Sequence, residues 1–91
     1  MAKAVPIKVT AGNNANPNRA RAARGALLLW YCDHDNFEVR FVNKYPTRKK
    51  SYKSRGRYVI ARVKRRADKD KYPYKLKVGQ NPSSDPDIIV F

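Results

Sequence analysis

Cysteine, acidic residues and long apolar runs are all scarce in this sequence. Cys32 is its one cysteine, which excludes a disulfide within the chain. The most apolar window, residues 25–31, is far shorter than the roughly 20 residues that cross a bilayer. No apolar run of signal-peptide length follows the start of the chain. We therefore expect a cytoplasmic protein with no membrane contact.

The shortage of acids also bears on catalysis. Most of the seven acidic residues lie among turn-forming residues, where aspartate serves local hydrogen bonding, so no paired-carboxylate acid and base are evident. Phosphate-binding and dinucleotide-binding fingerprints are absent from the sequence. We expect a protein that is not an enzyme, and an enzyme whose site is completed across an oligomer is the third-ranked hypothesis.

The hydrophobic pattern has the two-residue period of β-strands rather than the period of helices. We expect strands at residues 5–10, 26–31, 37–42, 58–64, 72–78 and 87–91, and a short edge strand in the ambiguous segment 19–24. Residues 11–18, 33–36, 65–71 and 79–86 have turn or loop composition. Ninety-one residues with six or seven short strands predict a small, all-β, single-domain β-sandwich over residues 1–91.

Three details of this pattern carry further predictions. Residues 26–31 are almost continuously apolar, as in a central strand covered on both faces. Pro6 indicates an edge position for the first strand, because proline cannot donate to a ladder. Residues 43–57 form a long connection between the two sheets, with a basic loop at 44–57.

The segment from Gly25 to Phe91 resembles small bacterial cupredoxin-like sandwich proteins. In those proteins, a strand with glycine and tryptophan leads through an aspartate-rich turn to a Phe-x-Val-x-Phe strand. A Tyr-x-Tyr strand and an ending Asp-Pro-x-Ile-Ile-Val follow. The corresponding residues here are Gly25, Trp30, Asp33, Asp35, Phe37, Val39, Phe41, Tyr72, Tyr74, Val78, Asp85, Pro86, Ile88, Ile89 and Val90. The resemblance implies a cupredoxin-like or immunoglobulin-like sandwich and no particular mechanism.

The copper centre of that fold is not expected in this chain. A blue-copper site needs two histidines, a cysteine thiolate and usually a thioether, whereas the chain has one histidine, one cysteine and one methionine. Cys32, Asp33, His34 and Asp35 are close in sequence, but we interpret them as a half-buried cysteine and a solvated turn. They are not expected to form a metal site or a thiol nucleophile with its base. We predict no metal and no cofactor.

The most informative feature is the excess of positive charge. Lysine and arginine number 21 against seven acids, a net charge of +14. Eleven cations lie between residues 44 and 66 with no acid among them, and they predict a polyanion-binding surface. These are Lys44, Arg48, Lys49, Lys50, Lys53, Arg55, Arg57, Arg62, Lys64, Arg65 and Arg66. Tyr45 and Tyr52 lie among them as candidates for stacking on nucleic-acid bases.

Two binding hypotheses follow from this charge. The first is a nucleic-acid module, in which the cations neutralise phosphates and the tyrosines stack on bases. The second is an accessory subunit that binds a larger assembly, such as a ribonucleoprotein, a capsid or an acidic protein. A continuous basic stripe with exposed tyrosines favours the first, and basic residues around an apolar patch favour the second. The same alternation predicts a wet, cationic strand face at Lys75 and Lys77.

Overall fold

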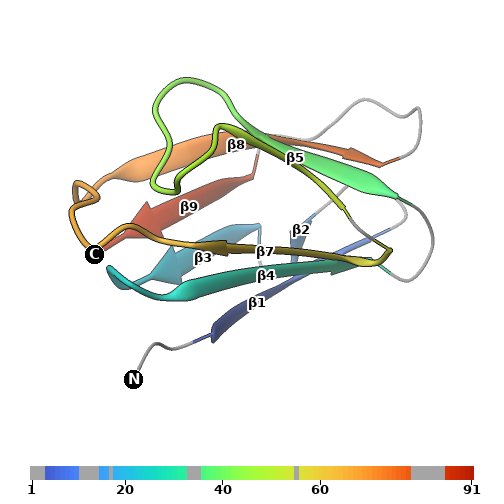
Figure 1. Ribbon diagram of the computed structural model, residues 1–91, viewed down its shortest axis with the longest axis horizontal. Helices are drawn as coiled ribbons and strands as arrows, with labels where there is room; N and C mark the ends of the chain where they lie inside the picture. The colour runs from blue at the N-terminus through green and yellow to red at the C-terminus, as the bar shows by residue number, and fades with distance from the viewer. Residues whose placement is uncertain (1–3, 11–14, 17, 33–35, 55, 79–85) are drawn as a thin grey trace.

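A computed structural model describes residues 4–10, 15–16, 18–32, 36–54, 56–78 and 86–91. These residues contain nine strands and no helix (Figure 1). The strands are β1 (Ala4–Val9), β2 (Ala15–Asn16), β3 (Arg19–Ala22), β4 (Leu27–Cys32), β5 (Phe37–Phe41), β6 (Ser51–Lys53), β7 (Tyr58–Arg62), β8 (Lys71–Val78) and β9 (Asp87–Val90).

The strands form two sheets packed face to face, so the predicted β-sandwich is confirmed. The four-stranded sheet has the order β2-β1-β4-β7, and the five-stranded sheet has the order β3-β9-β8-β5-β6. β1 runs parallel to β4 and β3 runs parallel to β9, whereas the other pairs are antiparallel. The edge strands β2 and β3 are consecutive in the chain, as are β6 and β7, so the chain changes sheet at each lateral side of the sandwich.

The strands of four or more residues were predicted correctly, and the two shorter ones were not. The predicted segments correspond to β1, β3, β4, β5, β7, β8 and β9, with β3 at a sheet edge. β2 and β6 were missed because two or three residues are too few to show a period. The 43–57 connection therefore contains a strand, and the chain changes sheet after it. The predicted turn at 33–36 lies mostly outside the described residues, as does most of the predicted loop at 79–86.

The prediction of an edge position for the first strand needs correction. β1 lies between β2 and β4, so it is an inner strand of its sheet. However, β2 pairs only with Lys8 and Val9 of β1. Pro6 pairs with Leu29 of β4 and has no strand partner on its other side within the described residues. The proline is thus accommodated where the ladder is one-sided.

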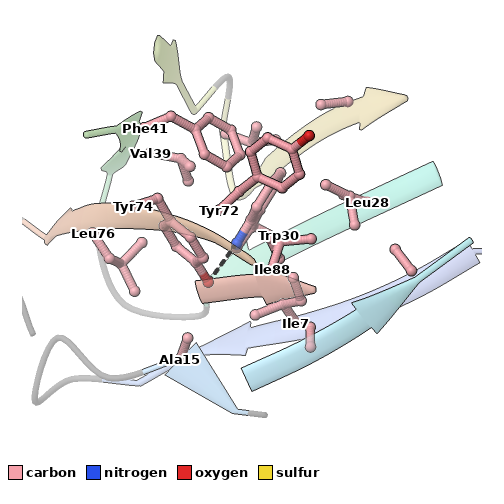
Figure 2. Packing of buried hydrophobic residues seen from close by; sticks show 14 of the residues in the cluster. Ile7, Ala15, Leu28, Trp30, Val39, Phe41, Tyr72, Tyr74, Leu76 and Ile88 are labelled. Atoms are coloured by element: carbon pink, nitrogen blue, oxygen red, sulfur yellow. Dashed lines mark hydrogen bonds between the residues drawn. The ribbon is translucent and has the colours of Figure 1, made fainter. Parts of the chain in front are cut away.

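The core lies between the sheets and is built by alternate residues of each long strand. Trp30 of β4 and Tyr74 of β8 meet at its centre, with both side chains fully buried. Trp30 Nε1–H donates a hydrogen bond to Tyr74 Oη at 3.1 Å (Figure 2). The two rings meet edge to face with centroids 5.7 Å apart, a favourable geometry for aromatic pairs. The predicted core position of Trp30 is confirmed.

The turn into β4 requires a left-handed backbone at Gly25, whose φ is +82°. A Cβ at this position would approach no atom closer than Arg65 Cγ at 4.0 Å. Gly25→Ala should therefore destabilise the protein by about 1–2 kcal/mol through backbone strain rather than a clash. Gly25→Asn should cost less, because asparagine tolerates this conformation better. Urea denaturation of the two variants measures the difference, and an alanine variant as stable as the asparagine variant would contradict it.

Candidate functional site

The outer face of the four-stranded sheet is apolar across its three longest strands. In β4, Leu28, Trp30 and Cys32 are buried, whereas Leu27, Leu29 and Tyr31 point to the opposite face and are only half-buried. The prediction that this strand is covered on both faces is therefore wrong. A run of apolar residues does not show which of its two faces the chain itself covers.

The register of β1, β4 and β7 arranges the outward side chains in rows across the sheet. One row contains Pro6, Leu29 and Ile60, and the next contains Lys8, Tyr31 and Tyr58. The third row contains Ala4, Leu27 and Arg62. We call these nine residues the apolar face. Directly opposed side chains of one sheet face contact each other, so the rows form a continuous surface.

The β7 side of the apolar face is the most open. Ile60 is 63% exposed and Tyr58 is 57% exposed, the two highest values among the large hydrophobic residues described. The face carries the cations Lys8 and Arg62 and no acidic side chain. Single exposed hydrophobic residues need no explanation, but a continuous apolar surface marks a binding site.

The outer face of the five-stranded sheet has the opposite character. Its outward residues include Arg21 on β3, Arg40 on β5 and Lys71, Lys75 and Lys77 on β8. Lys75 and Lys77 alternate with the buried Tyr74, Leu76 and Val78, which confirms the predicted wet, cationic strand face. The two sheets thus share one core, and among the described residues only the four-stranded sheet has a continuous apolar outer face.

A groove lies next to the apolar face, between the edge strands β6 and β7. Its volume is about 470 Å³, within the range of ligand-binding clefts. Its lining residues are Lys49, Ser51, Tyr52, Lys53, Tyr58, Val59 and Ile60. Tyr58 and Ile60 belong to both surfaces, so the groove and the apolar face are continuous. The lining contains two cations and no acid.

The cations predicted to bind a polyanion lie in several different parts of the structure. Lys49 and Lys53 both line the groove, and Arg62 lies on the apolar face. Lys44 pairs with Asp70, and the Lys64 ammonium lies 5.7 Å from the Tyr45 ring centroid. The remaining described cations of this set are exposed in loops and turns: Arg48, Lys50, Arg57, Arg65 and Arg66. Arg55 lies outside the described residues.

The two candidate stacking tyrosines have protein partners. Tyr52 is partly buried against the core, and its hydroxyl accepts a hydrogen bond from the Lys49 backbone N–H at 3.2 Å. Tyr45 is 37% exposed and lies under the Lys64 ammonium. These contacts place the two rings in different surroundings, one at the groove and one against Lys64.

One exposed ion pair and two buried tyrosines have shifted pKa values. The hydrogen bond between Lys44 and Asp70 raises the pKa of Lys44 and lowers that of Asp70. The Lys44 ammonium also lies 5.5 Å from the Tyr72 ring centroid, and burial raises the pKa of Tyr72. Burial raises the pKa of Tyr74 to about 12. None of these groups lines the groove. Their pKa shifts therefore affect the stability of the fold and not the charge of the groove.

The described residues contain no group of three or more His, Cys, Asp or Glu side chains that could hold a metal ion. Cys32 is fully buried in β4, not half-buried as predicted. Asp33, His34 and Asp35 lie outside the described residues. In the same described part of the chain, no helix is long and apolar enough to cross a membrane.

Comparison with solved structures reveals a likeness in fold. The chain is similar to a novel purple cupredoxin from Nitrosopumilus maritimus, with a TM-score of 0.68 and 13% sequence identity. The match covers 94% of this chain and 98% of the cupredoxin chain. No family model and no curated protein sequence matches the chain. At this identity the likeness shows a cupredoxin-like fold alone.

The prediction of a nucleic-acid-binding module is wrong on this evidence. The solved structure to which the chain is similar is a cupredoxin, not a nucleic-acid-binding protein. The tyrosines assigned to base stacking are engaged with Lys49 and Lys64. What the sequence did not reveal is the apolar face with Leu29, Tyr58 and Ile60. In the sequence, the apolar face is indicated only by apolar residues at alternate positions of β4 and β7.

Proposed function

We propose that this chain is a non-catalytic binding domain that uses the apolar face to dock on an acidic partner protein. The observation that carries the proposal is the row formed by Pro6, Leu29 and Ile60, which no strand of the described chain covers. Apolar residues at the centre of a patch with polar residues around it are typical of protein interfaces. The cations beside this row favour a partner of opposite charge.

The proposed domain acts without copper. Two histidine ligands are needed for a blue-copper centre, and the whole sequence supplies one histidine. Its one cysteine points into the core from β4 with its side chain fully buried. The composition and this burial support a sandwich used as a scaffold for binding rather than for electron transfer.

The charge of the chain also favours a different protein over a second copy as the partner. Two copies meeting through the apolar face would each bring a net charge of +14 to the interface. Like charges oppose such association, whereas an acidic partner is attracted before contact. Analytical ultracentrifugation at physiological salt should therefore find a monomer. A stable dimer that is lost in Ile60→Ser would contradict the proposal.

A photoreactive amino acid at position 60 should cross-link this chain to one acidic protein in cells that make it. The matched control carries the same group at position 75, on the cationic face of the other sheet. With the purified partner, Leu29→Ser and Ile60→Ser should each weaken binding at least about tenfold, as apolar anchors of interfaces do. Lys75→Ser should leave the affinity unchanged. Equal losses of affinity for Ile60→Ser and Lys75→Ser would show that binding does not depend on the apolar face and would contradict the proposal.

A further inference from the structure

β7 is less protected against further pairing than the other three edge strands of the described sandwich. β2 has two residues, β6 has three with a lysine, and β3 carries Arg19 and Arg21. Charges, prolines and short lengths are the usual means by which sheet edges avoid further pairing. β7 has five residues, Tyr-Val-Ile-Ala-Arg, with no proline and no charge before its last position. It is therefore the longest and least protected edge of the described sandwich.

The hydrogen bonds around β7 show which of its backbone groups are available. Cys32 N–H donates to Arg57 C=O, and Val63 N–H donates to Ala26 C=O. Backbone groups alternate sides along an antiparallel strand, so residues 57, 59, 61 and 63 face β4. The N–H and C=O groups of Tyr58, Ile60 and Arg62 consequently face the other side. Within the described residues, no strand pairs with β7 there.

The same edge already makes one bond of this kind beyond the end of β7. Lys64 continues the alternation of Tyr58, Ile60 and Arg62, and its N–H donates to Pro46 C=O at 2.8 Å. The loop that contains Pro46 thus pairs with the edge at this one position. Among the described residues, no backbone bond is made to the outward groups of Tyr58, Ile60 and Arg62. The groove lies alongside two of them, Tyr58 and Ile60.

A strand added at this edge would present its side chains alternately to two different surfaces. One set would extend the rows of the apolar face beside Tyr58 and Ile60. The other set would point between the sheets, into the groove with Lys49 and Lys53. Residues 43–67 contain no acid, so no side chain of this run neutralises the two lysines. The complementary segment therefore alternates apolar and acidic residues.

We propose that β7 binds an extended segment of the acidic partner by strand addition, which gives the four-stranded sheet a fifth strand. Backbone hydrogen bonds to Tyr58, Ile60 and Arg62 supply affinity, and the two side-chain surfaces supply selectivity. This inference rests on the proposed function and adds to it the conformation and sequence pattern of the bound segment. The segment carries apolar residues toward Ile60 and carboxylates toward Lys49 and Lys53.

The test uses an acetylated and amidated peptide, Glu-Val-Glu-Val-Glu-Val-Glu, titrated into the intact protein. Amide hydrogen exchange should slow at Tyr58, Ile60 and Arg62, whereas Val59 and Ala61 already face β4 and should change little. A control peptide with the same residues in blocks, Glu-Glu-Glu-Glu-Val-Val-Val, has equal charge and should bind at least about tenfold more weakly. Equal binding of the two peptides would overturn the proposal.

Backbone methylation provides a second, sharper test. Two further peptides carry N-methyl groups either on all valines or on all glutamates. Only alternate residues of an added strand bond to β7, so one methylated peptide should bind like the parent and the other at least about tenfold more weakly. Loss of binding on methylated valines indicates antiparallel addition, and loss on methylated glutamates indicates parallel addition. Equal affinities for the two methylated peptides would overturn strand addition.

A protein variant separates this inference from the proposed function. Ile60→Pro removes the central outward N–H of β7, at an edge position where proline is tolerated. Ile60→Thr keeps that N–H and a β-branched side chain, and serves as the matched control. Both substitutions shorten the apolar side chain at position 60, so the loss due to the N–H is the difference between them. Peptide binding should be at least about tenfold weaker in the proline variant than in the threonine variant. A partner complex that is weakened by Leu29→Ser, and equally by Ile60→Pro and Ile60→Thr, would overturn strand addition and leave docking on the apolar face intact.

Discussion

Trp30→Ala is expected to destabilise the protein by about 3–5 kcal/mol, the cost of removing a large aromatic side chain from a packed core. Trp30 is fully buried, and its removal also leaves Tyr74 Oη without the N–H donor at 3.1 Å. For a domain of this size, the melting temperature should fall by more than about 10 °C. Urea denaturation followed by circular dichroism measures the change in the free energy of unfolding.

Two further variants test the origin of that loss. Trp30→Phe keeps an aromatic ring against Tyr74 and should lose less stability than the alanine variant. Ile60→Ala removes a side chain that is 63% exposed, and should change stability by no more than about 0.5 kcal/mol. A Trp30→Ala protein as stable as Ile60→Ala would mean that the centre of the sandwich lies elsewhere.

The second large effect is an alkaline loss of stability that depends on Tyr74. Burial raises the pKa of Tyr74 to about 12 from an ordinary value of 10.0. Its contribution is fully present below pH 10, where both folded and unfolded chains hold the proton. As the pH rises from 10 to 12, the unfolded chain loses the proton first, which lowers the free energy of unfolding. The full difference of about two pKa values corresponds to about 2.7 kcal/mol.

Tyr74→Phe is the control for this pH dependence. The variant lacks the ionisable hydroxyl, so its free energy of unfolding should fall less steeply between pH 10 and pH 12. Near neutral pH it should be about 1–3 kcal/mol less stable than the parent, because the buried Trp30 N–H loses its acceptor. Urea denaturation across this pH range gives both slopes. Parallel slopes for parent and variant would show that Tyr74 ionises as readily in the folded protein as in the unfolded one.

Much of the fold was accessible from the sequence, because alternation of apolar and polar residues shows one buried face. In β8 the buried Tyr74, Leu76 and Val78 alternate with lysines, and the strand and its orientation follow directly. The short strands β2 and β6 were not accessible. Each is held by its neighbour, β1 or β5, and their own two or three residues carry no pattern.

The candidate site was less accessible, since it depends on contacts between distant segments. The apolar face arises when Leu29 of β4 lies between Pro6 of β1 and Ile60 of β7. Both faces of β4 are apolar. The sequence alone does not show whether the second face is covered by the chain itself or by a partner protein. Charge was the stronger signal along the sequence, but folding separates the cations that are close in sequence. Lys44, Lys49 and Lys64 lie in three different surroundings.

The pairing of β3 with β9 also bears on how the chain is made. Arg19 to Ala22 form an outermost strand whose only sheet neighbour in the described chain is β9, with Arg19 opposite Asp87. During synthesis, β3 emerges from the ribosome long before residues 87–90 exist. The five-stranded sheet can therefore close only after β9 has been synthesised. Until then β3 has no sheet neighbour and the edge of β8 that pairs with β9 is open, so the nascent chain is exposed to aggregation or chaperone binding.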